Sequence, residues 1–248
     1  MMKRIMIIPA AGTGSRLGAS APKVLVRVNG QPMLDYLFEL YAPVVDLFVV
    51  VVSPGAEEEV RRFLGTVSVS TRVALQQEPT GMLDAILIPT EELSELRPAQ
   101  IWITWCDQIA VCSQTVHKLA QATNNAAGAR LVFPTIQREH PYIHFQRDKS
   151  GVITGIAQQR EGDTMPQIGE NDMGLFVLSD SAYFDLLPCF SRETGLGDET
   201  KERNFLPFTV WMQRHGVVQS LPGTHYLESI GVNTQAELKQ IEQWLLDR

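Results

Sequence analysis

The feature that most constrains the fold is a short apolar run followed directly by a glycine-rich loop; residues 5–23 read IMIIPAAGTGSRLGASAPK. Four apolar residues, Ile5–Ile8, stand together without polar alternation, which is typical of a buried strand. The glycines that follow let backbone N–H groups turn toward one point, which suits phosphate oxygens. Arg16 can grip an anion with its planar guanidinium, and Lys23 can add a mobile charge. The loop therefore predicts a nucleotide-phosphate site at the exit of a buried strand.

The glycine spacing is also close to the G-x-G-x-x-G pattern of dinucleotide-binding dehydrogenases. That fold needs an acidic residue at the end of its second strand to hold the ribose. The second apolar run, Leu47–Val52, ends instead in Ser53-Pro54-Gly55, without a carboxylate. A P-loop is disfavoured too, since no Gly-Lys-Ser/Thr follows the glycines. The dehydrogenase remains the weaker alternative.

Length and charge narrow the class of protein and its partners. A chain of 248 residues with 44% hydrophobic content can bury a full core, and we expect residues 1–248 to form one domain. The net charge of −7 argues against nucleic acid or an anionic membrane surface as the partner. A small polyanionic ligand is compatible with this charge where cations gather locally.

The three cysteines indicate a reducing compartment, and the apolar runs bear on whether the chain is exported or spans a membrane. Cys106, Cys112 and Cys189 have no metal-like spacing and cannot all pair. The apolar stretch near the N-terminus stops at Pro9, which is too short for a signal peptide, and no run reaches transmembrane length. We therefore expect a cytoplasmic protein, with a homo-oligomer left open.

Strand-like apolar runs alternate with segments of helical periodicity. The expected strands are Ile5–Ile8, Leu47–Val52, Val67–Leu75, Ile101–Trp105 and Arg130–Phe133. The expected helices are Met33–Tyr41, Glu57–Leu64, Gly81–Leu87, Ser113–Ala122 and, near the C-terminus, Ala236–Leu245. Ser113 can cap its helix. The alternation predicts an α/β fold with a doubly wound, mostly parallel sheet and helices on both faces.

The second half of the chain changes character. Tyr142–Gln146 and Val152–Gln159 flank a polar, glycine-bearing turn and predict a hairpin. A further apolar run covers Leu175–Leu178. These pieces predict a few antiparallel strands added to the parallel core. The polar stretch Ser191–Arg203 predicts an exposed loop or lid.

Two oxygen-bearing side chains are candidate ligands for Mg²⁺. Asp107 follows a buried strand, so it lies at the sheet edge that faces the ligand crevice in parallel sheets. Magnesium takes hard oxygen ligands, of which usually one or two come from protein, and Asn233 can supply the second. Each residue also has a structural alternative. Asp107 could cap the helix or turn before Ser113. Asn233 could belong to an ordinary helix N-terminus, and without the other motifs this alternative would be favoured.

Two further segments are candidates for reading the base and the acceptor. In the base segment, Gln77 offers a donor and an acceptor for a pyrimidine edge, and Gly81 permits close approach of a flat base. A Pro-Gly turn with solvated glutamines is the alternative there. In the second segment, Arg160, Asp172 and Gly174 could bind sugar hydroxyls and a second phosphate, or form a solvated hairpin end.

The motifs together resemble those of nucleotidylyltransferases, the sugar-phosphate and related NTP transferases with a GT-A-like, Rossmann-type fold. Pro9–Gly18, with Pro22-Lys23 and Gly30–Leu34, resembles the family signature. Four more segments resemble later family motifs in the right order. They are Gln77–Gly81 for the base, Cys106–Gln108 for the metal, Glu170–Gly174 for the acceptor (E-x-N-x-G) and Gly231–Thr234 for the completed metal site.

The resemblance implies roles for these positions. Arg16 would hold the β- and γ-phosphates, Lys23 would neutralise the α-phosphate, and Asp107 with Asn233 would hold Mg²⁺. The acceptor phosphate is already anionic, so positioning and charge stabilisation should dominate the reaction. The residues expected to bind the nucleotide are Ala11, Gly12, Thr13, Gly14, Gln77 and Gly81. Those expected to bind the acceptor are Gln159, Arg160, Asp172 and Gly174.

This chain departs from the family pattern at four places, all toward the acceptor side. Cys106 replaces the usual glycine before the metal aspartate, and Asp172 replaces the usual asparagine. Gln159-Arg160 replaces a Glu-Lys pair, and Tyr142-Ile143 replaces a glycine-bearing turn. The resemblance therefore implies nucleotide activation more firmly than it implies a particular acceptor.

Our leading hypothesis is an Mg²⁺-dependent nucleotidylyltransferase that joins an NTP, with a pyrimidine base favoured, to a sugar 1-phosphate. One alternative is a cytidylyltransferase acting on a non-sugar phosphate such as phosphocholine or a polyol phosphate. Another is a non-catalytic sensor of nucleotide sugars. The sequence leaves the base and the acceptor open.

Overall fold

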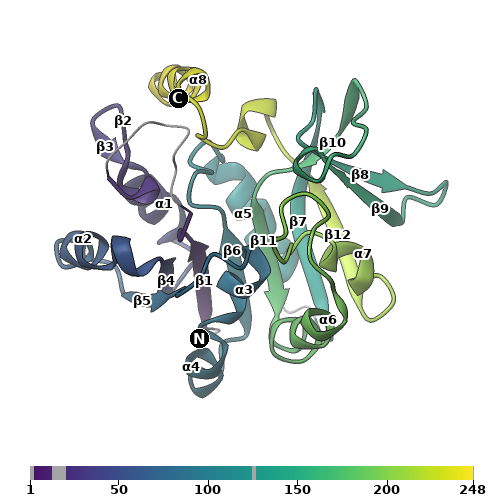
Figure 1. Ribbon diagram of the computed structural model, residues 1–248, viewed down its shortest axis with the longest axis horizontal. Coiled ribbons are helices and arrows are strands. Elements are labelled where there is room, and N and C mark those ends of the chain that lie inside the picture. Colours follow the sequence, from purple (N-terminus) through teal and green to yellow (C-terminus); the bar gives the residue numbers. More distant parts are fainter. Residues whose placement is uncertain (1–2, 13–20, 125–126, 248) are drawn as a thin grey trace.

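The computed structural model describes residues 3–12, 21–124 and 127–247. Its centre is a sheet of eight strands in the order β10-β7-β11-β6-β1-β4-β5, with β12 paired to β7 (Figure 1). Helices pack on both faces of this sheet. The α/β fold with a parallel core and added antiparallel strands, expected from the sequence, is confirmed.

The parallel core explains where the site must lie. It comprises β1 (Arg4–Pro9), β4 (Leu47–Val52), β5 (Thr71–Leu75) and β6 (Gln100–Thr104), in which β1 pairs in parallel with β4 and β6, and β4 with β5. The chain runs outward from β1 to β5 and then returns to the other side of β1. In open α/β sheets, ligands bind at the carboxyl edge where the strand order reverses in this way. Ala11 and Gly12 after β1, and Asp107 after β6, lie at that edge.

Antiparallel strands extend the sheet beyond β6. They include β7 (Arg130–Glu139), β10 (Ile168–Asp172) and β11 (Leu175–Ser179), whereas β12 (Val217–Pro222) is parallel to β7. The predicted hairpin is present as β8 (Ile143–Arg147) and β9 (Ile153–Gln158) and extends from the body of the molecule (Figure 1). A second small hairpin joins β2 (Arg27–Val28) to β3 (Gln31–Pro32).

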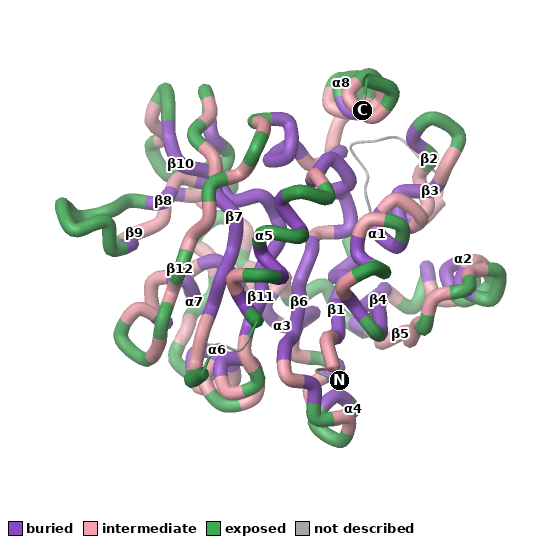
Figure 2. The backbone as a smooth tube through the Cα atoms, turned by 180° about the vertical axis from the view of Figure 1, so that it is seen from behind, coloured by how far each residue is buried: buried purple, intermediate pink, exposed green. Residues whose placement is uncertain are grey.

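Side-chain alternation along the strands builds a core on each face. Met6 and Ile8 of β1 belong to one cluster, and Ile5 and Ile7 to the other. The first cluster is covered by α1 (Met33–Tyr41), α2 (Pro54–Leu64), α5 (Ser113–Thr123) and α8 (Gln235–Leu246). The second is covered by α3 (Met82–Leu87), α4 (Thr90–Leu96), α6 (Leu187–Glu193) and α7 (Phe208–Met212). Figure 2 shows the burial concentrated in the central strands, with exposed residues along the outer helices and the hairpin tip.

Two strands differ from their expected bounds by more than one residue at an end. The strand expected over Val67–Leu75 begins only at Thr71, because Val67 and Val69 pack against the core from a non-paired connection. The strand expected over Arg130–Phe133 continues to Glu139. Pro134 is tolerated inside it because pairing with β11 ends at Val132 and pairing with β10 begins at Thr135, so its missing N–H falls between the two ladders.

Two local expectations need correction. Ser113 does not cap its helix: it is the first residue of α5, and Cys112 stands at the cap position without a side-chain cap hydrogen bond. The Cys112 N–H donates instead to the distant Glu228 carboxylate, at 2.8 Å. The stretch Ser191–Arg203 is not all loop, because α6 continues through its first three residues. In the part of the chain that the structure describes, no helix has the length and apolar character needed to cross a membrane.

Candidate nucleotide and metal site

Three side chains from distant parts of the chain meet at the carboxyl edge of the sheet. The Lys23 ammonium donates to the Asp107 carboxylate at 2.5 Å and to the Asn233 side-chain oxygen at 2.8 Å. Lys23 begins the short helix η2 (Lys23–Leu25), Asp107 follows β6, and Asn233 precedes α8. The side chains of Lys23 and Asp107 are each only 12% exposed. The structure thus brings together Lys23, which is expected to neutralise the α-phosphate, and the two expected metal ligands Asp107 and Asn233.

Asn233 belongs to the N-terminus of α8, as the structural alternative expected, but it precedes the cap residue and does not itself cap the helix. Thr234 stands at the cap position, and its hydroxyl accepts the Glu237 N–H at 3.2 Å. The Glu237 carboxylate in turn accepts the Thr234 hydroxyl and the Asn233 N–H, at 2.9 and 3.0 Å. This reciprocal arrangement completes the first turn of α8 and leaves the Asn233 side-chain oxygen to face Lys23.

Close backbone approach places Asn233 beside Asp107. The Val232 N–H donates to the Asp107 carbonyl oxygen at 3.1 Å. A Cβ atom at Gly231 would lie 2.9 Å from the carboxyl carbon of Asp107, closer than real contacts allow. The glycine of the Gly231–Thr234 motif therefore has a steric reason: it lets this segment dock against the end of β6.

Glu228 anchors the same segment, and sequence reasoning did not single it out. Its carboxylate is fully buried and accepts N–H groups from Cys112 at 2.8 Å, Thr224 at 2.9 Å and His225 at 2.9 Å, as well as the Thr224 hydroxyl. Burial acts to raise the pKa of Glu228, but these hydrogen bonds outweigh it and lower the pKa below its ordinary value. Its position just before Gly231 was the only sequence signal. Glu228 thus ties the approach to Asn233 to the start of α5.

The base segment leaves β5 at the same edge of the sheet. Gln76 is buried, and its side-chain amide donates to the Gly81 carbonyl oxygen at 3.1 Å, which closes the loop. Gln77 is exposed. Gly81 has a φ of +124°, a backbone conformation that glycine adopts without strain and other residues rarely adopt. A Cβ at Gly81 would also lie 2.5 Å from the backbone nitrogen of Arg203. The predicted base-reading residues are therefore held in a tightly packed turn.

The segment Glu170–Gly174 contributes a buried carboxylate whose charge interacts with that of Asp107. Asp172 is 4% exposed, and its carboxylate accepts the Gly174 N–H at 2.8 Å. Burial raises its pKa to about 6, and the negative charge of Asp107 acts in the same direction. Gly174, with φ of +60°, packs against the side chains of Trp105 and Gln108 where a Cβ would clash. The Gln108 side-chain oxygen is buried and has no hydrogen-bond partner among the described residues.

The other two predicted acceptor residues lie apart from this buried group. Gln159 and Arg160 form part of the exposed helix η3 (Gln159–Glu161), and Arg160 comes within 4.0 Å of Glu202. Glu170 is already occupied, since it makes a bidentate ion pair with Arg147 at 2.7 and 2.6 Å. The structure thus joins Asp172 and Gly174 to the edge that carries Asp107, while Gln159 and Arg160 remain on the surface.

Only part of the glycine loop can be placed. Ala11 is half-buried and Gly12 is exposed, directly after β1, and the Ala10 N–H donates to the Val51 carbonyl oxygen at 2.7 Å. The predicted nucleotide-binding Thr13 and Gly14, and the predicted phosphate-binding Arg16, lie outside the described residues.

The donor set at the edge fits a hard divalent cation. Two oxygens, one from a carboxylate and one from an amide, already converge on a single positive charge, the Lys23 ammonium. Mg²⁺ is commonly held by one or two protein oxygens together with substrate phosphates and water. Among residues 3–12, 21–124 and 127–247, no cluster of three or more His, Cys, Asp or Glu side chains suited to a metal is present. Burial raises the pKa of the neighbouring Cys106 to about 12, so this thiol stays neutral.

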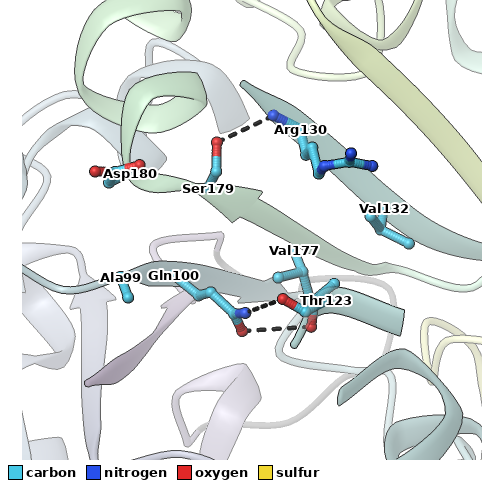
Figure 3. A pocket seen from close by; sticks show the side chains of 8 residues that line it. All are labelled: Ala99, Gln100, Thr123, Arg130, Val132, Val177, Ser179 and Asp180. Atoms are coloured by element: carbon cyan, nitrogen blue, oxygen red, sulfur yellow. Dashed lines mark hydrogen bonds between the residues drawn. The ribbon is translucent and has the colours of Figure 1, made fainter. Parts of the chain in front are cut away.

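A separate hollow of about 180 Å³ lies near the opposite edge of the sheet (Figure 3). It is bordered by Gln100, the first residue of β6, whereas Asp107 follows the other end of that strand. Gln100 donates to the Thr123 carbonyl oxygen at 2.6 Å, and the Arg130 N–H donates to the Ser179 hydroxyl at 3.0 Å. These polar groups are bonded in separate pairs, and none of them belongs to the site at the carboxyl edge.

The fold is a doubly wound α/β sheet whose polar side chains lie at the strand-order reversal, where such sheets bind ligands. The family model described as the MobA-like NTP transferase domain matches residues 6–172. The chain belongs to this family of nucleotidyltransferases, which confirms the resemblance inferred from the motifs.

The comparison with curated proteins finds relatives along the whole chain. It is 26% identical over 247 residues to the bifunctional protein GlmU of Staphylococcus saprophyticus, covering 98% of this chain and 52% of that protein. It is 27% identical over 248 residues to GlmU of Pelotomaculum thermopropionicum, covering 98% and 52%. The chain therefore spans about half the length of the curated relatives it matches.

Two solved structures share the fold. A protein from Bacillus anthracis assigned as a glucose-1-phosphate thymidylyltransferase, solved in complex with a sucrose, has a TM-score of 0.79 at 16% identity, with 99% of this chain and 96% of that chain covered. HddC from Yersinia pseudotuberculosis has a TM-score of 0.67 at 16% identity, with 99% and 100% covered. At this identity the two structures support the fold alone.

Proposed function

We propose that residues 1–248 form one nucleotidylyltransferase domain that transfers NMP from an NTP to a sugar 1-phosphate. An oxygen of the acceptor phosphate attacks the α-phosphorus of the NTP in line. The bond between the α-phosphorus and the bridging oxygen breaks, and pyrophosphate leaves with the electron pair. The acceptor oxygen carries no proton at neutral pH, so the reaction needs no general base. The protein's part is to position the two substrates and to offset their charge.

The observation that carries this proposal is the meeting of Lys23, Asp107 and Asn233 at the carboxyl edge. Two oxygens and one ammonium from three distant segments converge there, in a chain that belongs to an NTP transferase family. Because the net charge of the chain is −7, a polyanionic ligand needs cations gathered at its site, and the Lys23 ammonium supplies one at this edge.

Each residue then has a distinct task. Asp107 and Asn233 would hold Mg²⁺, which would bind phosphate oxygens and offset their charge. Lys23 faces the same two oxygens, and its ammonium, on a flexible stem, would neutralise the charge of the α-phosphate. Arg16 would hold the β- and γ-phosphates. The base would lie against Gln77–Gly81, where glutamine suits a pyrimidine.

On the acceptor side we assign Asp172 and Gly174 to the sugar and Gln159 with Arg160 to the outer rim. Asp172 can accept hydrogen bonds from sugar hydroxyls, which are donors. Arg160, exposed and only 4.0 Å from Glu202, has a cation to offer to an incoming phosphate. The relationship to GlmU along the whole chain supports a sugar 1-phosphate as the acceptor.

Pyrophosphate release tests the proposal. The protein would be assayed with five NTPs against sugar 1-phosphates, phosphocholine and a polyol phosphate, each with and without Mg²⁺. We expect turnover with one sugar 1-phosphate, and a loss of at least 100-fold in Asp107→Ala, because a metal ligand contributes several kcal/mol to the transition state. Asp180→Asn is the matched control, since this exposed carboxylate lies after β11 at the opposite edge.

The same panel decides between the alternatives. Turnover only with CTP and a non-sugar phosphate would replace the sugar acceptor with the cytidylyltransferase alternative. Tight nucleotide-sugar binding by calorimetry without turnover would favour a sensor. Silence throughout, with Asp107→Ala indistinguishable from the native chain, would overturn the proposal.

A further inference from the structure

A compact turn over residues 197–204 connects the acceptor side of the molecule to the base segment. It lies within the polar stretch that the sequence predicted as an exposed loop or lid. Its backbone closes on itself, since the Gly197 N–H donates to the Glu202 carbonyl oxygen at 2.8 Å and the Lys201 N–H donates to the Gly197 carbonyl oxygen at 3.2 Å. These hydrogen bonds restrain the backbone of the turn, so a displacement of one end is expected to shift the other end as well. We call it the 197–204 turn.

At its acceptor end, the 197–204 turn surrounds the carboxylate of Glu161, the last residue of η3. That carboxylate accepts the Glu199 N–H at 3.0 Å, the Thr200 N–H at 3.3 Å, the Thr200 hydroxyl at 2.5 Å and the Asn204 side-chain amide at 2.8 Å. A Cβ at Gly197 would lie 2.5 Å from the same carboxylate. Four donors on one carboxylate, all from one turn, make Glu161 its anchor.

At its other end, the 197–204 turn is bonded to the base segment. The Arg203 N–H donates to the Thr80 carbonyl oxygen at 2.8 Å, and the Leu83 N–H donates to the Arg203 carbonyl oxygen at 3.0 Å. These two bonds flank Gly81, whose missing Cβ leaves room for the Arg203 backbone. The Arg203 guanidinium pairs with Asp84 of α3 at 2.6 Å and donates to the Ser191 hydroxyl at 2.6 Å. Arg203 thus holds the base segment by backbone and side chain together.

We infer that Glu161 and Arg203 are positioning residues that set the base segment against the acceptor side through the 197–204 turn. The inference rests on the proposed function, in which Gln77–Gly81 holds the base. Glu161 has no hydrogen bond with that segment among those recorded for the described residues, and acts on it only through the turn. Loss of the hydrogen bonds to Glu161, on the acceptor side of the molecule, should therefore raise the KM for the NTP.

The test compares Glu161→Gln with the control Asp198→Asn. Both remove one carboxylate charge near the same turn, but the Asp198 carboxylate makes no hydrogen bond or ion pair recorded among the described residues. Glu161→Gln puts an amide donor where the carboxylate faces four donors. We expect it to raise the KM for the NTP about fivefold to tenfold with kcat nearly unchanged, because the change disturbs placement of the nucleotide and not the reacting groups. Asp198→Asn should change neither constant.

Hydrogen exchange gives a readout that does not need turnover. In Glu161→Gln, amides of residues 80–87 should exchange severalfold faster, although they lie on the far side of the turn, while amides of β4 stay unchanged. Arg203→Lys, which keeps the charge but loses the forked contacts with Asp84 and Ser191, should accelerate the same amides.

The outcomes separate the two proposals. An unchanged KM for the NTP, or faster exchange in Glu161→Gln confined to residues 157–163 and 197–204, would overturn the inference while leaving the nucleotidylyltransferase intact. If the protein turns over no substrate, but amides 80–87 exchange faster in Glu161→Gln as expected, the proposed reaction would be overturned. The coupling of Glu161 to the base segment through the 197–204 turn would still hold. Equal effects of Glu161→Gln and Asp198→Asn would show that charge alone is responsible, and would also overturn the inference.

Discussion

Replacing the buried Asp172 by asparagine should stabilise the protein near neutral pH. The Asp172 carboxylate is 4% exposed, and burial together with the charge of Asp107 raises its pKa from 3.8 to about 6. A rise of roughly two units corresponds to about 3 kcal/mol between the two protonation states, and we take this as an upper bound. Asparagine has nearly the same shape, and its side-chain oxygen can still accept the Gly174 N–H.

The sign of the pH dependence follows from proton binding. Because the folded-state pKa is above the unfolded value, the folded protein binds more protons between pH 4 and pH 6, and its stability falls as pH rises through that window. Asparagine does not titrate. The free energy of unfolding of Asp172→Asn should therefore match that of the native chain near pH 4 and exceed it by up to about 3 kcal/mol above pH 7.

Urea unfolding at intervals from pH 4 to pH 8, in the presence of a chelator, measures this difference directly. Asp198→Asn removes an exposed carboxylate and should show no such pH-dependent gain. A difference between Asp172→Asn and the native chain that stays flat with pH, or an asparagine variant less stable at pH 8, would refute the reasoning. A carboxylate kept at a cost in stability is expected where a residue serves function, and here that function is the proposed contact with the acceptor.

Other substitutions probe the remaining contacts. Lys23→Met leaves the largely buried Asp107 carboxylate without its cation, so we expect a loss of about 2–4 kcal/mol in stability, and Mg²⁺ should raise the melting temperature more than it does in the native chain; equal Mg²⁺ shifts in both would argue against a shared cation position. Gly81→Ala meets both the positive φ and the Arg203 backbone, and should cost about 2 kcal/mol or more in urea unfolding, where no loss would contradict the tight packing. Glu228→Gln removes a buried charged acceptor and should cost about 2–3 kcal/mol. Its reduced stability should persist across pH 6–8, since the pKa of Glu228 is lowered and native Glu228 stays ionised there.

Features that depend on local pattern could be predicted from the sequence. Met33–Tyr41 and Leu47–Val52 are recovered with the bounds expected from periodicity, because burial of one helical face or one unbroken apolar run is encoded by neighbouring residues. The position of Asp107 at the same edge of the sheet as the end of β1 also follows from the sequence, since the carboxyl ends of parallel strands share one edge.

Contacts between segments far apart in the chain were decided only by the tertiary structure. Ser113 is a residue type that commonly caps helices, yet Cys112 stands at the cap position of α5, and its N–H donates to the buried carboxylate of Glu228, 116 residues away. The hydrophobic periodicity of the sequence does not indicate that β12 pairs with β7. It also does not indicate that the 197–204 turn donates hydrogen bonds to Glu161.

The sequence by itself therefore determined the class of fold, the edge that carries the site, and the types of side chain that reach it. Only the tertiary structure decided which carboxylates at and around that edge are buried, paired or raised in pKa: Asp107 faces Lys23, Glu170 is taken by Arg147, and Asp172 is left without a cation within ion-pairing distance among the described residues. The physical reason is that periodicity is a property of adjacent residues, whereas desolvation and charge pairing depend on every atom packed around a group.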